Sequence, residues 1–158
     1  MQTRPTSVKP TLPSTVLPHA DWADAYEIET RREFSDMKAA ALCIVGGMPR
    51  WAKPRLWLRN VIVAPFDLKP GNHSIVQTDV DHVDFFPMLT ETEEHIVLGL
   101  DDRHLDFSIL FERQTSQDGA RYRLTTLVER HNLFGRVYLF AITPFHKWII
   151  RSVLSNAF

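Results

Sequence analysis

Hydrophobic and polar positions alternate over residues 24–29 ("DAYEIE"), and this period of two predicts a strand. The pattern changes to helical spacing after Phe34-Ser35, which we interpret as the N-cap of a helix that ends at Gly46-Gly47. The side of this helix that should be buried is an apolar stripe made of Met37, Ala40, Ala41, Ile44 and Val45.

A second short helix is predicted over residues 49–63, with a new start or a kink at Pro54. The polar segment 67–84 that follows should be irregular. The period of two then returns in four stretches that predict strands: 85–91, 94–100, 104–113 and 120–130. Because the linkers between them are short, these strands should form an antiparallel meander.

The final segment is the most apolar part of the chain. Its uncharged run, residues 137–146, would be only about 15 Å long as a helix, whereas a membrane span needs roughly 20 apolar residues. We therefore expect no membrane span, but a long helix that covers the sheet, with Asn132 as its N-cap and a kink at Pro144. The stripe expected to be buried is Tyr138, Ala141, Ile142, Phe145, Trp148, Ile149 and Val153.

The element order predicts an α+β fold in which a curved antiparallel sheet grips a long C-terminal helix, with two short helices after the first strand. Residues 1–20 carry four prolines among polar residues, so we expect a disordered or extended leader, or alternatively a domain-swapped arm. Residues 21–158 should form a single domain.

Composition narrows the functional classes. The formal net charge is −1 and the basic residues are scattered, which argues against nucleic-acid binding. Cys43 is the only cysteine and lies beside the apolar stripe of its helix, so we interpret it as packing rather than a nucleophile. A single cysteine and the lack of a secretory signal favour a cytoplasmic protein. No phosphate-binding loop or hydrolase motif occurs, so we expect no cofactor.

Two motifs carry a family resemblance: "LGLDDRHLDFSI" and "ERHNLFGRVYLFAITPFHKWIIRSVL". They resemble the characteristic segments of a bacterial domain-of-unknown-function family, number 2867, from about Asp21 to the end of the chain. The element order is similar to the START-like (SRPBCC) helix-grip superfamily, whose members leave an apolar cavity between the sheet and the C-terminal helix. The resemblance implies this fold and implies no reaction.

The candidate catalytic residues are His104, Asp106 and His131. His104 and Asp106 are two residues apart on a strand, so both side chains should point to one face, where a carboxylate could orient an imidazole. His131 at the end of the neighbouring strand would also permit a two-histidine, one-carboxylate metal site, although we favour an ordinary surface pair and assign no metal. His146 we interpret as structural.

The favoured hypothesis is a soluble module that binds an apolar or amphipathic small molecule between the sheet and the C-terminal helix. Its candidate ligand-binding residues are the aromatic ones: Trp51, Trp57, Phe107, Phe111, Tyr122, Phe145 and Trp148. A cyclase- or isomerase-type enzyme that uses His104, Asp106 or His131, and a homodimeric interaction protein, are the alternatives.

Overall fold

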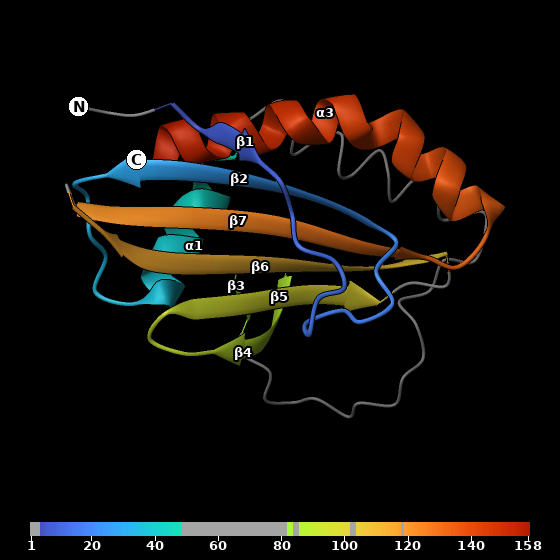
Figure 1. Ribbon diagram of the computed structural model, residues 1–158, viewed down its shortest axis with the longest axis horizontal. Coiled ribbons are helices and arrows are strands. Elements are labelled where there is room, and N and C mark those ends of the chain that lie inside the picture. Colours follow the sequence, from blue (N-terminus) through green and yellow to red (C-terminus); the bar gives the residue numbers. More distant parts are fainter. Residues whose placement is uncertain (1–3, 49–81, 84–85, 102–103, 118) are drawn as a thin grey trace.

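The computed structural model describes residues 4–48, 82–83, 86–101, 104–117 and 119–158. The strands in this part of the chain are β1 Thr6–Val8, β2 Trp22–Thr30, β3 His82–Val83, β4 Phe86–Glu91, β5 His95–Asp101, β6 Leu105–Ser116 and β7 Gly119–Arg130. The helices are α1 Met37–Gly46 and α3 Leu133–Ala157. The strands lie side by side in the order β1-β2-β7-β6-β5-β4-β3, and neighbouring strands are antiparallel (Figure 1).

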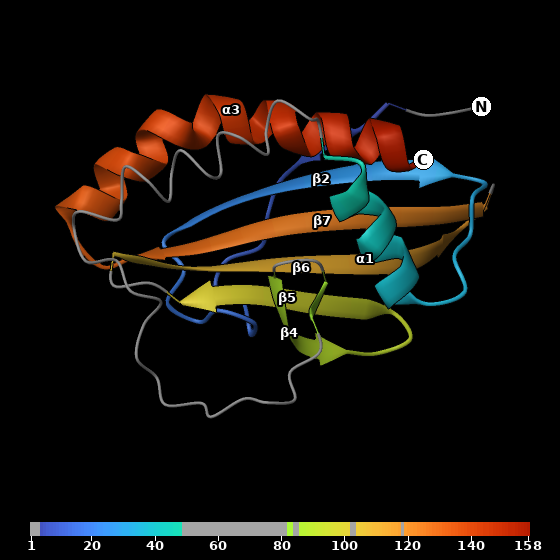
Figure 2. The ribbon, with the colours of Figure 1, turned by 180° about the vertical axis from the view of Figure 1, so that it is seen from behind.

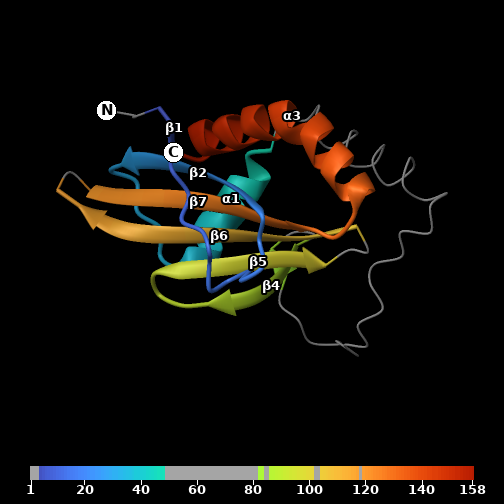
Figure 3. The same cartoon turned by 45° about the vertical axis from the view of Figure 1, so that its right-hand side comes forward.

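Both helices lie on the same face of the sheet. Viewed from behind, α1 crosses in front of β6 and β5, and α3 arches along the side of the sheet formed by β2 and β7 (Figure 2). The strands are curved, which Figure 3 shows most clearly. The predicted α+β class, with an antiparallel sheet and a long C-terminal helix, is therefore confirmed.

The core lies where α1, the C-terminal half of α3 and one end of the sheet meet. Tyr122 of β7 is fully buried there, stacked between Phe111 at 5.6 Å and Phe158 at 4.7 Å. The α1 stripe predicted from the sequence, Met37, Ala40, Ala41, Ile44 and Val45, is buried throughout. Each large apolar side chain buried in this way contributes roughly 1.5–3 kcal/mol, so this cluster anchors α1 to the sheet.

The four strands predicted in the second half of the chain are confirmed as β4 to β7, and the strand predicted at 24–29 as β2. The predicted start of α1 was wrong by one residue. Its N-cap is Asp36, whose carboxylate accepts a hydrogen bond of 2.6 Å from the amide of Ala39. Ser35 instead donates its hydroxyl to Asp36, so the better acceptor occupies the cap position.

The predicted orientation of α3 was wrong. The helix buries Gly135, Leu139, Ile150, Val153, Leu154 and Ala157, and only Val153 belongs to the predicted stripe. Phe145 and Trp148 are 51% and 54% exposed. The apolar residues of α3 are distributed around most of its circumference, so their spacing did not indicate which side faces the sheet.

The leader is placed on the face of the sheet opposite the helices. Residues 6–8 form β1 and pair with β2, and the chain then crosses in front of β7 and β6 before it enters β2 (Figure 1). Arg123 of β7 holds this crossing by donating to the carbonyl oxygen of Lys9 at 3.1 Å.

The helix predicted over residues 49–63 and most of the predicted irregular segment 67–84 lie outside the described residues. Within that segment, His82–Val83 forms the short strand β3 rather than irregular structure, and it pairs with Phe86 and Pro87 of β4.

Neither α1 nor α3 combines the length and hydrophobicity needed to cross a lipid bilayer.

Gly119 closes the β6–β7 hairpin with φ +142°, and a Cβ there would lie 2.5 Å from the carbonyl oxygen of Thr30. Gly119→Ala should therefore lower the free energy of unfolding by about 1–3 kcal/mol, measured by urea denaturation. Gly46→Ala is the control, because a Cβ at Gly46 meets nothing within 4 Å and alanine favours a helix. Equal losses in the two variants would contradict the strain argument.

Candidate functional site

The residues predicted as catalytic lie at the junction where β6 begins, β7 ends and α3 starts. His104 directly precedes β6 and Asp106 is the second residue of that strand, whereas His131 and Asn132 connect β7 to α3. The amide of His131 donates to the carbonyl oxygen of His104 at 3.0 Å. A Cβ at Gly135, in the first turn of α3, would clash with that same oxygen. Only glycine permits so close an approach of the helix to the strand.

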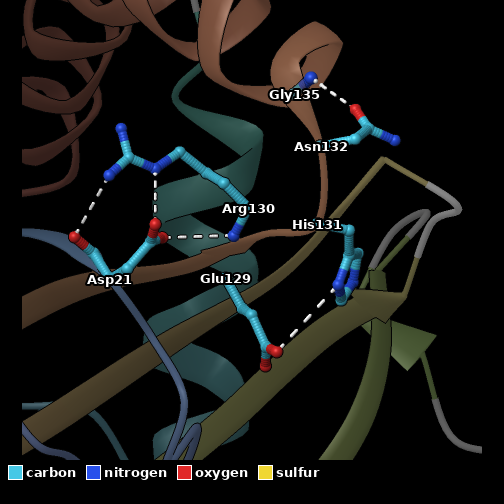
Figure 4. A network of polar contacts seen from close by, with 6 residues as sticks. All are labelled: Asp21, Glu129, Arg130, His131, Asn132 and Gly135. Carbon is cyan, nitrogen blue, oxygen red and sulfur yellow. Dashed lines mark hydrogen bonds and ion pairs between the residues drawn. The ribbon is translucent and has the colours of Figure 1, made fainter.

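His131 and Asp106 form an ion pair across the junction. Nε2 of His131 lies 3.0 Å from Oδ2 of Asp106. On the other side of the ring, Nδ1 of His131 lies 4.0 Å from a carboxylate oxygen of Glu129, the contact drawn in Figure 4. The hydrogen bond to Asp106 raises the pKa of His131 above its ordinary value. The negative charges of Asp106, Glu129 and Asp101 act in the same direction, whereas burial opposes them. The site therefore favours a protonated imidazole.

His104 binds the residue that caps the start of α3. Asn132 caps α3 as predicted, because its side-chain oxygen accepts from the amide of Gly135 at 3.0 Å (Figure 4). Its amide nitrogen is then left to donate, and it lies 2.8 Å from Nδ1 of His104. The His104 ring also packs against Phe134, with centroids 4.7 Å apart. Because an amide nitrogen cannot accept, Nδ1 of His104 is the acceptor of this bond.

Asp106 and Glu129 are directly opposite each other on β6 and β7. Side chains alternate along a strand, so Asp106 lies on the face opposite Phe107 and away from α1. The side chains of His131 and Asp106 are 33% and 23% exposed. These groups thus form a half-buried pair on the outer face, and they do not border the interior between the sheet and α3. Within the described ranges, no group of three or more histidine, cysteine or acidic residues is arranged to hold a metal ion.

The five predicted ligand-binding aromatic residues that the structure describes lie in three different places. Phe111 and Tyr122 stack on each other in the core, whereas Phe107 is half-buried near the edge of Phe86, 5.7 Å between centroids. Phe145 and Trp148 lie on an exposed side of α3. Trp51 and Trp57 lie outside the described residues.

A second polar group, which the sequence interpretation missed, lies between the sheet and α3. Asp24 of β2 and Thr126 of β7 are directly opposite each other and are only 8% and 2% exposed. His146 reaches down from α3, so that its Nε2 lies 3.3 Å from Oδ1 of Asp24. Its ring also meets the edge of Trp22, 6.0 Å between centroids.

Two oxygens of this group have no hydrogen-bond partner in the part of the chain that the structure describes. Oδ2 of Asp24 and Oγ1 of Thr126 are buried and accept or donate no hydrogen bond within the described part of the chain. A signal in the sequence could have revealed them. Asp24 has the same strand parity as Tyr26, and Thr126 the same parity as Leu124, so both polar residues occupy core-facing positions. His146 was interpreted as structural, but it approaches this group from α3.

Protonation of His131 should stabilise the fold at low pH. Its pKa is raised in the folded chain, so the stabilisation is fully present below the unfolded pKa of about 6.5 and is lost as the pH rises through the folded value. Asp106→Asn should lower the free energy of unfolding by up to about 1 kcal/mol near pH 6 and by less near pH 8.5. Urea denaturation at several pH values measures this, and the NMR titration of His131 should shift to lower pKa in the variant.

Asp21→Asn is the matched control. Asp21 pairs with Arg130 at 2.9 Å (Figure 4), and arginine does not titrate in this range. The cost of this variant should therefore be the same at both pH values. An unchanged His131 titration in Asp106→Asn would contradict the assigned pairing.

Comparison with known proteins gives a family but no characterised relative. The chain has no match among curated proteins or solved structures. The family model described as "Protein of unknown function (DUF2867)" matches residues 16–153. This match includes the whole of β2, α1 and the strands β3 to β7, and most of α3. The chain therefore belongs to the DUF2867 family of proteins of unknown function.

Proposed function

We propose that this protein binds an amphipathic small molecule between the sheet and α3, as a START-like helix-grip domain. The observation that carries the proposal is the pair of buried oxygens of Asp24 and Thr126 on adjacent strands beneath α3, which have no hydrogen-bond partner among the described residues. A buried polar atom without a hydrogen bond costs about 1–3 kcal/mol. A ligand that supplies the missing bonds would recover this free energy on binding.

The chemistry of the two oxygens defines the polar end of the ligand. An ionised carboxylate only accepts hydrogen bonds. Oδ2 of Asp24, the oxygen that His146 does not contact, therefore needs a donor from the ligand. The hydroxyl of Thr126 can donate or accept. The ligand should therefore carry an amine or a hydroxyl group there, and an amine would gain most from the carboxylate charge.

The apolar end of the ligand has candidate neighbours on the same face of the sheet. Val128 of β7 is opposite Trp22 of β2 and Phe107 of β6. Val128 is 3% exposed, yet neither it nor Phe107 belongs to the core cluster under α1 among the residues described. These three side chains continue the row of Asp24 and Thr126 towards the start of α3, and they would contact the hydrocarbon part of a ligand.

Two probes of equal chain length and opposite charge test the polar end. Dodecylamine should bind more tightly than dodecanoate, measured by isothermal titration calorimetry below their micelle concentrations. Asp24→Asn should weaken dodecylamine binding about tenfold, because a charge-assisted hydrogen bond is lost. Asp106→Asn removes a carboxylate from the outer face and should leave the preference unchanged. Equal binding of both probes, or no binding of either, would refute the proposal, and native mass spectrometry of the purified protein would then show whether another ligand co-purifies.

Thr126→Val separates binding from stability. Valine has nearly the same shape and removes a buried hydroxyl that has no described partner. The free energy of unfolding without ligand should rise by up to about 1 kcal/mol, while dodecylamine affinity falls about threefold or more. Thr125→Val, on the opposite face of β7, should not change the affinity. A loss of stability in Thr126→Val would mean that the hydroxyl already has a partner in the protein.

A further inference from the structure

The first half of α3 exposes an apolar stripe on the side away from the sheet. Leu133, Val137 and Phe140 are 75%, 60% and 85% exposed, and their spacing places them on one side of the helix. Gly135 and Leu139, on the opposite side, are buried. Phe140 is the most exposed large hydrophobic side chain among the described residues. Scattered exposed leucines are common, whereas a continuous apolar stripe on one helix marks a contact surface.

The charged side chains that α3 itself contributes are all basic. α3 contains Arg136, Lys147 and Arg151 and no aspartate or glutamate, although the whole chain has a formal net charge of −1. Arg136 and Lys147 are exposed beside the stripe. Arg151 is placed differently, because its guanidinium lies over the ring of Tyr26 at 5.7 Å. The surface of α3 therefore complements a negatively charged partner.

We propose that this stripe docks on an anionic lipid bilayer. The side chains of Leu133, Val137 and Phe140 would enter the boundary between headgroups and acyl chains, and Arg136 and Lys147 would contact lipid phosphates. α3 lies along one border of the molecule in Figures 1 and 2.

The size of the stripe favours a membrane over a protein partner. From Leu133 to Phe140 it runs about 10 Å along the helix, and three side chains are few beside the 20–30 residues on each side of a typical stable protein interface. Lipid requires no matching shape, so a short apolar stripe with basic neighbours is sufficient for reversible binding. The helix itself cannot span the bilayer, so the contact is peripheral.

Vesicle flotation of the full chain tests the proposal. The protein should float with vesicles of phosphatidylcholine mixed with phosphatidylglycerol, several-fold more than with phosphatidylcholine alone, and high salt should reduce the bound fraction. Phe140→Ser should lower the affinity about tenfold, since a large apolar side chain no longer enters the lipid. Arg136→Glu should reduce binding only to the anionic vesicles. Far-UV circular dichroism verifies that each variant is folded.

Matched variants elsewhere on the surface provide the controls. Leu42→Ser removes a 45% exposed leucine from α1, and Arg31→Glu reverses an exposed charge after β2. Both should bind vesicles like the unaltered chain. Thr126→Val should also float normally, because vesicle docking does not depend on the proposed ligand site.

Three results would overturn the proposal. One is the absence of flotation with anionic vesicles. Another is flotation that neither Phe140→Ser nor Arg136→Glu reduces. The third is a concentration-dependent dimer that Phe140→Ser abolishes while flotation stays absent, which would assign the stripe to a second copy of the chain.

Discussion

The close backbone contact between the first turn of α3 and the residue before β6 fixes where the C-terminal helix begins on the sheet. The carbonyl oxygen of His104 lies against the first turn of α3 at Gly135 and accepts the amide of His131. Asn132 secures the same turn by capping the helix and reaching His104. Since one end of a rigid helix is fixed in this way, the path of the remaining residues over β7 and β2 follows from its direction.

At the other end of α3 the helix is fixed by packing. Leu154 and Ala157 are fully buried in the cluster that α1 completes, and Arg32 donates to the carbonyl oxygen of Ala157 at 2.6 Å. Between these two anchors, His146 comes down on Asp24. The polar group beneath α3 therefore depends on both ends of the helix. The junction with β6 sets the direction of the helix axis. The core packing sets the rotation of the helix about that axis, which turns His146 towards the sheet and Phe140 towards the solvent.

The sequence predicted most elements of the described chain because their patterns were unambiguous. Strict alternation gave the long hairpin of β6 and β7, and the polar side chain of Asn132 before an apolar run gave the start of α3. The rotation of α3 was not predictable in this way, because both Leu139, which is buried, and Phe140, which is not, belong to the same apolar run. Local spacing contains no information about which of them meets the sheet.

The candidate site was predictable in part for a related reason. Strand geometry predicts that His104 and Asp106 share a face. The hydrogen bond between Asn132 and His104, however, depends on how closely α3 approaches the strand. In the sequence, only Gly135 indicates this close approach. Asp24 was overlooked because a single acidic residue in a strand resembles a solvent-facing one until its parity with Tyr26 is considered.

The short strands at the two borders of the sheet bear on self-association. A long unpaired border presents a row of free amide and carbonyl groups to which another chain can add a strand. Here β1 covers only the middle of β2, and β3 pairs with two residues of β4. β4 itself contains Pro87 and an irregularity in register between Met88 and Thr90, features that prevent continuous pairing with a neighbour. Within the described residues, both borders of the sheet are therefore short or irregular, which disfavours the addition of a strand from a second molecule and hence edge-to-edge growth into fibrils.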